Sequence, residues 1–98
     1  MEFKIYVLKS IENNEVKYVG VTTNELNKRL HKHYYDVKAN KTKNSHKIYW
    51  FNNNMNNIII EQIDSADNKK DAFEKEVSWI NKFTQDGINL INKTKGVS

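Results

Sequence analysis

Six side chains in this sequence have the chemistry needed to act on a phosphate group. They are Tyr6, Tyr18, Arg29, His33, Glu76 and Asn89. Hydrolysis of a phosphodiester needs a base for the attacking water, a cation for the charge that develops on phosphorus, and a group that stabilises the leaving oxygen. A metal ion can meet the last two needs at once. The hypothesis of a phosphodiester hydrolase therefore depends on whether the fold brings these residues together.

Arg29 is the only arginine in a chain with fifteen lysines. A single arginine in such a background indicates a need for the planar guanidinium, which binds phosphate through two parallel hydrogen bonds. His33 follows four residues later, so the two side chains are neighbours if the segment is helical. Histidine can hold or transfer a proton near neutral pH. The ordinary alternatives are a surface ion pair for Arg29 and an exposed histidine in a basic helix for His33.

Glu76 lies beside apolar residues of an expected helix. Mg²⁺ often binds only one or two protein carboxylates and completes its shell with water and phosphate oxygens, so a carboxylate close to a buried face suits it. The alternative is a solvated glutamate in the Glu-Lys-Glu run at 74–76.

The two tyrosines lie in alternating segments, residues 3–10 and 15–21, which predict a β-hairpin. A two-residue turn at Asn13–Asn14 would place the tyrosines on opposite faces, because one residue of slip turns every side chain over. A loop centred on Asn13 instead pairs Ile5 with Val21, Tyr6 with Gly20, Val7 with Val19 and Leu8 with Tyr18. We predict this second register, since it gathers the branched aliphatics on one face and both tyrosines on the other.

The remaining elements are predicted from caps and periodicity. Thr22 and Glu25 have the spacing of a capping box, so a helix is expected to begin there. Its buried stripe is Leu26, Leu30, Tyr34 and Val37. A short helix after Ser45 would bury Ile48 and Phe51, and residues 57–63 have the continuous apolar character of a buried strand.

A last helix is expected to start between Ser65 and Asn68 and to end near Phe83 or Thr84, before the helix-breaking Gly87. We expect its buried stripe to be Ala72/Phe73, Val77 and Ile80. The order β-β-α-α-β-α predicts an α+β fold with a small three-stranded antiparallel sheet flanked by helices.

Length and composition limit the possible classes of protein. A chain of 98 residues predicts one domain over 1–98. The absence of cysteine excludes disulfides, thiolate metal sites and a cysteine nucleophile, and is typical of a reducing compartment. No apolar run approaches the roughly 18 residues of a membrane span, and the first residues lack a signal-peptide pattern. We therefore expect a cytoplasmic, intracellular protein without a membrane partner.

Positive charge is concentrated in one segment. Residues 27–47 hold seven Lys/Arg and one acid, a balance of +6, whereas the whole chain carries +4, so the rest is net −2. This segregation is typical of nucleic-acid binding, although a solvated helix face would also account for it. The expected contacts to nucleic acid are Lys28, Lys32, Lys43, His46 and Lys47.

Taken in order, these motifs resemble those of the GIY-YIG endonucleases, most of all the catalytic domains of phage and intron-encoded homing endonucleases. The matching pieces are KIY at 4–6, YVG at 18–20, R-x-x-x-H at 29–33, EVSWI at 76–80 and GIN at 87–89 followed by Gly96. The closing piece nominates Asn89, with Asn92 as a second candidate. Lys4 replaces the first glycine of the family motif. A second histidine of some members aligns near Thr42, and His46 is the nearest histidine.

The resemblance implies a metal-dependent DNA endonuclease that uses one Mg²⁺ or Mn²⁺ ion held by Glu76. Tyr6 would deprotonate the attacking water, which requires nearby cations because a free phenol has a pKa of about 10. Arg29 would neutralise the phosphate, His33 and Tyr18 would position water or relay the proton, and Asn89 would close the site. The two tyrosine roles remain interchangeable at this point.

Other functions are compatible with the same scaffold. These are an inactive nucleic-acid-binding module, a restriction or repair nuclease, and a structural or protein-interaction domain. The presence of all five central side chains favours an enzyme, which would act on DNA in a bacterial or phage-infected cell. The sequence has no module that reads bases, so either a separate DNA-recognition domain or protein supplies sequence preference, or the nuclease has low specificity.

Overall fold

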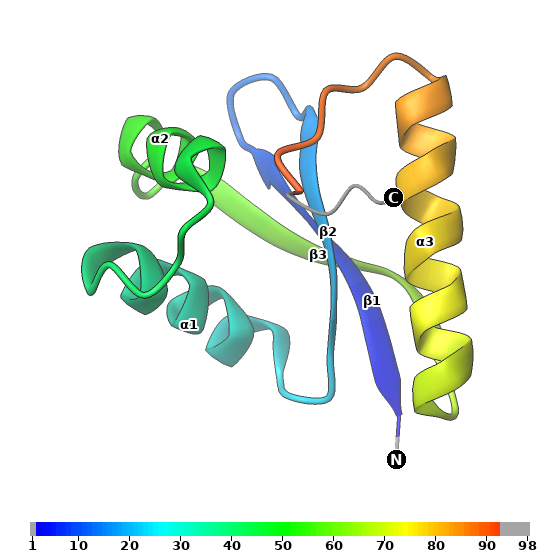
Figure 1. The fold of residues 1–98 in the computed structure, drawn as a ribbon. Helices are drawn as coiled ribbons and strands as arrows, with labels where there is room; N and C mark the ends of the chain where they lie inside the picture. Colours follow the sequence, from blue (N-terminus) through cyan, green and yellow to red (C-terminus); the bar gives the residue numbers. More distant parts are fainter. Residues whose placement is uncertain (1, 93–98) are drawn as a thin grey trace.

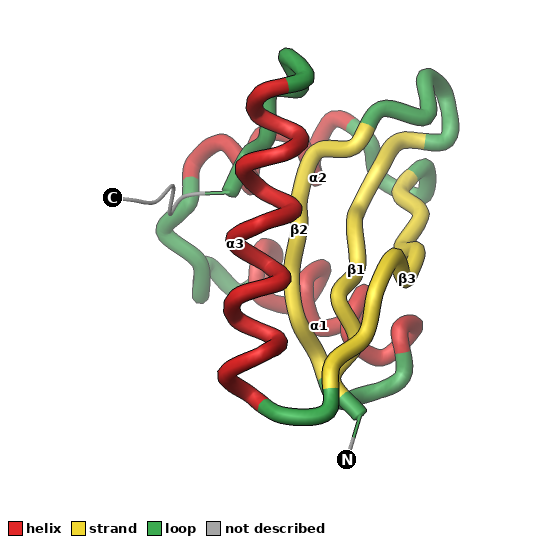
Figure 2. The backbone as a smooth tube through the Cα atoms, turned by 90° about the vertical axis from the view of Figure 1, so that its right-hand side faces the viewer, coloured by secondary structure: helices red, strands yellow, loops and turns green. Residues whose placement is uncertain are grey.

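The computed structural model describes residues 2–92. The described elements are β1 (Phe3–Ser10), β2 (Val16–Thr22), α1 (Leu26–Lys38), α2 (Ser45–Asn53), β3 (Ile58–Ala66) and α3 (Lys69–Gln85). The strands form one antiparallel sheet in the order β2-β1-β3, with β1 in the centre. Helices α1 and α2 lie on one face of the sheet and α3 covers the other (Figures 1 and 2). The predicted α+β fold and its element order are confirmed.

The hairpin has the register that places both tyrosines on one face. Ile5 pairs with Val21, Tyr6 with Gly20, Val7 with Val19 and Leu8 with Tyr18. The loop uses Asn14 at a φ of 57°, a conformation that asparagine tolerates better than most residues.

Alternation along β1 divides the interior into two apolar clusters. Tyr6 and Leu8 pack toward α1 and α2, together with the fully buried Phe51. Ile5 and Val7 pack on the opposite face, against Ala72 and the side chains of α3. The central strand therefore belongs to both clusters, and the tyrosine face is the one covered by α1 and α2.

The predicted capping box at the start of α1 is wrong. The helix begins at Leu26, and its N-cap residue Glu25 makes no side-chain capping bond. Thr22 is still the last residue of β2, and its hydroxyl accepts a hydrogen bond from the amide of Asn24 at 3.1 Å. The threonine thus stabilises the turn that leaves the strand, which is a common competing use of this side chain.

The buried face of α3 differs from the predicted stripe. Phe73 is 62% exposed and Val77 39% exposed, whereas Trp79 and Phe83 pack against the sheet with Ile80. Two aromatic side chains bury more apolar surface than Phe73 and Val77 would, so they set the rotation of the helix. The indole N–H of Trp79 also donates to Asp64 of β3 at 3.0 Å.

Strand β3 is an edge strand and not the buried strand that its apolar run predicts. Ile58 is buried, but Ile59 is 36% exposed. The strand also continues to Ala66, beyond the predicted end at residue 63.

In the described part of the chain, no helix has the length and apolar character to cross a membrane.

Candidate active site

The Tyr6 hydroxyl is the centre of a buried polar cluster between β1 and α1. It accepts a hydrogen bond from Nε of Arg29 at 3.1 Å and lies 2.7 Å from Nε2 of His33. Both partners come from α1, one turn apart, so a single helix face supplies them. Tyr6 is 0% exposed and His33 1% exposed. The exposed histidine that a basic helix suggests is therefore not observed.

Gly20 leaves the space that the Tyr6 ring occupies. It is the cross-strand partner of Tyr6, and a Cβ atom at this position would lie 2.5 Å from the hydroxyl oxygen and from the ring carbon that bears it. No real Cβ contact is that short, so any larger residue would displace the tyrosine. The glycine of the YVG motif is thus required by the position of Tyr6.

Tyr18 joins the cluster from β2. Its ring meets the His33 ring edge-on at 5.2 Å between centroids, and the two tyrosine rings lie 6.3 Å apart. Unlike Tyr6, Tyr18 is only partly buried and lines a surface pocket. One phenol is thus enclosed by protein, and the other faces the place where a ligand would bind.

Burial shifts the pKa of both phenols and of His33 in this cluster. It raises the pKa of both phenols above the ordinary value, and the neighbouring Arg29 opposes this shift. Burial, together with the cations Lys47, Arg29 and Lys32, lowers the pKa of His33 to about 3. The imidazole is therefore neutral at physiological pH, so its Nε2 can accept a hydrogen bond from the Tyr6 hydroxyl. Its Nδ1 is buried without a hydrogen-bond partner among the described residues.

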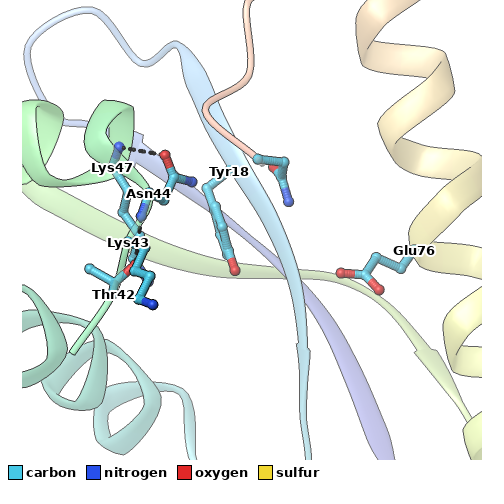
Figure 3. Close-up of a pocket in the computed structure, with 7 residues that line it drawn as sticks. Tyr18, Thr42, Lys43, Asn44, Lys47 and Glu76 are labelled. Carbon is cyan, nitrogen blue, oxygen red and sulfur yellow. Dashed lines mark hydrogen bonds between the residues drawn. The ribbon is translucent and has the colours of Figure 1, made fainter. Parts of the chain in front are cut away.

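The pocket beside Tyr18 has two chemically different sides. Its lining residues are Tyr18, Thr42, Lys43, Asn44, Lys47, Glu76 and Asn92. Figure 3 shows the loop and helix residues 42–47 on one side, Glu76 on the other, and Tyr18 between them. The cavity has a volume of about 280 Å³, at the low end for ligand sites. This size accommodates a phosphodiester with its associated water.

Glu76 reaches this pocket from α3, on the opposite face of the sheet from the tyrosines. It occupies the sheet-facing stripe between Ala72 and Ile80, and burial raises the pKa of its carboxyl group. Within residues 2–92, no group of three or more His, Cys, Asp or Glu side chains forms a metal cage. A single carboxylate that faces a pocket still fits Mg²⁺, because this ion keeps most of its waters and binds substrate phosphates.

The structure does not bring the side chain of Asn89 into this cluster. Asn89 is exposed, and its described contact is a backbone carbonyl that accepts from Lys17 at 3.5 Å. Asn92 instead lines the pocket and forms two hydrogen bonds with the backbone of Val19, at 2.9 and 2.8 Å. Of the two candidates, Asn92 is therefore the one that lies at the site.

The five basic residues expected to contact nucleic acid lie in different environments. Lys28, Lys43 and His46 are exposed, and Lys43 also lines the pocket. Lys32 forms an exposed ion pair with Asp36 at 3.1 Å. Lys47 is only 7% exposed.

Sequence reasoning did not anticipate the burial of Lys47 or the structural need for Gly20. Both follow from contacts between segments that are distant in the chain. A weak signal for Lys47 was available, because it lies three residues before Trp50 and four before Phe51, on the same face of the predicted helix.

Comparisons with known proteins identify the family and the fold. The family model of the GIY-YIG catalytic domain matches residues 2–92. Among solved structures, the catalytic domain of the homing endonuclease I-TevI is 24% identical, with a TM-score of 0.71 over 93% of this chain and 99% of that one. A mutant of the catalytic domain of the intron endonuclease I-TevI is 23% identical. Its TM-score is 0.77, and the match covers 99% of this chain and 98% of that one. No curated protein matches.

The two structural likenesses establish the shared fold. The family model spans all of the described residues, including both tyrosines, Arg29, His33 and Glu76. The chain belongs to the GIY-YIG nuclease family.

Proposed function

We propose that this domain is a divalent-metal-dependent DNA endonuclease that hydrolyses one phosphodiester at a time in the pocket between Tyr18 and Glu76. The observation that carries the proposal is the shared pocket of these two residues, backed by the hydrogen-bonded cluster of Tyr6, Arg29 and His33. A phenol and a carboxylate line the same cavity, and the ring of that phenol, Tyr18, contacts the neutral imidazole of His33.

The exposed fractions of the two phenols suggest different tasks. Tyr18 faces the pocket and is placed to contact the attacking water. Tyr6 is fully enclosed and contacts Arg29 and His33, so it orients both groups. The family resemblance first gave the contact with the attacking water to Tyr6 and a positioning role to Tyr18. We propose the reverse assignment, which the sequence had left open.

Arg29 is available to neutralise a phosphate. Its Nε donates to Tyr6, and the guanidinium forms no ion pair within the described range. The surface ion pair offered as an alternative for this arginine is therefore not seen there. The terminal nitrogens remain for the two parallel hydrogen bonds that an arginine makes to phosphate oxygens.

Glu76 is the residue that would hold Mg²⁺ or Mn²⁺, with water and phosphate oxygens as the other ligands. When bound, such an ion supplies Lewis-acid charge neutralisation for the phosphate and the leaving oxygen. Asn92 fixes the C-terminal segment to β2 beside the pocket, which is the closing role first assigned to Asn89.

Lys28, Lys43 and His46 give the α1–α2 side an exposed basic surface. We assign to this surface the contacts with neighbouring phosphates of the DNA strand, which supply affinity without sequence information. A homing-type nuclease would obtain sequence preference from a separate recognition domain or protein. Its DNA substrate would be that of a bacterial or phage-infected cell.

Incubation with supercoiled plasmid tests the proposed reaction. The protein should convert the plasmid to nicked or linear forms with Mg²⁺ or Mn²⁺, and chelation with EDTA should stop the conversion. Binding without cleavage under all metal conditions would indicate an inactive binding module on the same fold.

A further inference from the structure

Lys47 is a buried cation without a partner. Its side chain comes from the first turn of α2 and is only 7% exposed. Among the described residues, its ammonium group forms neither an ion pair nor a side-chain hydrogen bond. Lysine is almost never buried unless it is paired, so this arrangement indicates a ligand that is absent from the free protein.

Aromatic faces and a helix cap hold Lys47 in place. Its Nζ lies 5.4 Å from the centre of the Tyr18 ring and 5.9 Å from that of Phe51, within the range of cation–π attraction. Its backbone N–H donates to the side chain of Asn44 at 3.1 Å, and Asn44 in turn donates to the carbonyl of Ile91 at 2.7 Å. The start of α2 is thus anchored beside β2, which fixes Lys47 relative to Tyr18.

The electrostatic surroundings of Lys47 are predominantly positive. Burial, followed by the charge of Arg29, lowers the pKa of Lys47 to about 8; Lys32 acts in the same direction, whereas Asp36 opposes them. Asp36 is already paired with Lys32, and His33 is neutral. Among the described residues, no carboxylate forms an ion pair with Lys47 or Arg29.

We propose that Lys47 is a phosphate ligand inside the pocket, where it binds a non-bridging oxygen of the same phosphodiester that Glu76 faces from the other side. This inference rests on the proposed function, because it names the group that holds the substrate of that site. It separates Lys47 from Lys28 and His46, whose exposed side chains do not line the pocket and would contact only the flanking strand.

Two observations favour a phosphate over other anions. The pocket is two-sided, with Lys43 and Lys47 opposite Glu76, which suits an anion that also carries a metal ion on its far side. The nine-residue helix α2 begins at the side of the pocket that Asn44 and Lys47 line. The helix dipole favours negative charge at this N-terminus. The buried ammonium group of Lys47 lines the same pocket, and this group makes the helix N-terminus a candidate phosphate site.

Binding of a DNA duplex in EDTA tests the role of Lys47 without cleavage. The dissociation constant is measured over a range of salt concentrations for the wild type, Lys47→Met, Lys47→Arg and the control Lys69→Met, which removes a lysine that does not line the pocket. Lys47→Met should weaken binding several-fold and reduce the slope of log K against log salt by about 0.9, the amount for one lost phosphate contact. Lys47→Arg should keep the slope, and Lys69→Met should behave as wild type.

The pH dependence separates a phosphate ligand from a structural residue. The wild type should lose affinity as the pH rises through about 8, because Lys47 then loses its charge, whereas Lys47→Arg should not. A folded Lys47→Met with wild-type affinity and slope would overturn the proposal.

If Lys47→Met does not fold, the NMR signal of the Lys47 side chain in the wild type is followed during titration with inorganic phosphate. A shift supports the proposal and no shift overturns it. The outcome is independent of cleavage: a changed slope without any nuclease activity would refute the endonuclease and retain the phosphate site.

Discussion

The hydroxyl of Tyr6 lies 2.7 Å from Nε2 of His33, although the two residues are 27 positions apart in the chain. The contact requires β1 and α1 to pack closely against each other. It exists because Gly20 leaves the space for the Tyr6 ring and because Leu30 and Val37 fix the face of α1 that meets the sheet. Arg29 completes the cluster from the preceding turn of α1.

Replacing either tyrosine by phenylalanine should reduce cleavage, but for different reasons. Tyr6→Phe leaves Arg29 and His33 without their shared partner, so we expect a loss of about 1–3 kcal/mol in unfolding free energy as well as lower activity. Tyr18→Phe removes a hydroxyl that faces the pocket, so stability should change by less than about 0.5 kcal/mol while the rate falls about 10²–10⁴-fold. Urea unfolding and single-turnover cleavage measure the two effects. Equal stability losses in both variants would contradict the division of roles.

Gly20→Ala should damage the site although it adds only one methyl group. The new Cβ must push the Tyr6 ring away, which we expect to cost about 1–3 kcal/mol and to abolish the contacts with Arg29 and His33. Gly87→Ala is the matched control, because its φ of 86° makes it costly while its Cβ meets nothing within 4 Å. Only Gly20→Ala should reduce the cleavage rate of the folded fraction.

The buried His33 makes stability depend on pH. Its pKa is about 3 in the folded protein and about 6.5 in the unfolded chain, so the unfolded state binds more protons between these values. The contribution of His33 is therefore complete above pH 6.5 and is lost as the pH falls, by up to about 1.4 kcal/mol per pH unit. Urea unfolding between pH 7 and 5 should show a shallower dependence for His33→Gln than for wild type. His46→Gln, a substitution of an exposed residue of α2, is measured beside it as the control.

Asn92 and Asn89 provide a direct comparison of two candidate residues. Asn92→Ala removes both hydrogen bonds to Val19 and should lower the unfolding free energy by about 1–3 kcal/mol, with a loss of cleavage because the pocket loses one wall. Asn89→Ala should leave stability and cleavage close to wild type, since only its backbone makes the described contact. The opposite result would restore Asn89 as the closing residue of the site.

Local patterns in the sequence were sufficient to predict the frame of the fold. The alternation in β1 and β2 predicted the register, because this pairing puts Ile5, Val7, Val19 and Val21 on one face and both tyrosines on the other. The spacing of Leu26, Leu30, Tyr34 and Val37 correctly oriented α1.

The predictions for α3 and for the start of α1 were wrong because the sequence of each segment is compatible with two local arrangements. On α3, the residues Phe73 and Val77 form as regular a stripe as Trp79 and Phe83, and only packing against β3 and its Asp64 decides between them. The position of Thr22 is compatible with a helix cap and with a turn. The structure has the turn, because β2 extends to Thr22.

The site was predictable as a set of residues but not as a geometry. Motif order nominated Tyr6, Tyr18, Arg29, His33 and Glu76. No local pattern could show that Tyr6 is enclosed while Tyr18 faces the pocket, because that depends on how α1, α2 and the segment at 88–92 close over the sheet. The burial of Lys47 depends on the same long-range contacts.

The most direct test of the proposed function is the cleavage of supercoiled plasmid in Mg²⁺ by the wild type and by Glu76→Gln. The substitution keeps the shape of the side chain and removes its charge. Because burial raises the pKa of Glu76, the glutamine variant should be at least as stable as wild type at neutral pH, and thermal unfolding checks this. We predict cleavage by the wild type and a loss of at least about 10²-fold in a fully folded Glu76→Gln. Equal cleavage by the two proteins, or none by the wild type with either Mg²⁺ or Mn²⁺, would contradict the proposed mechanism.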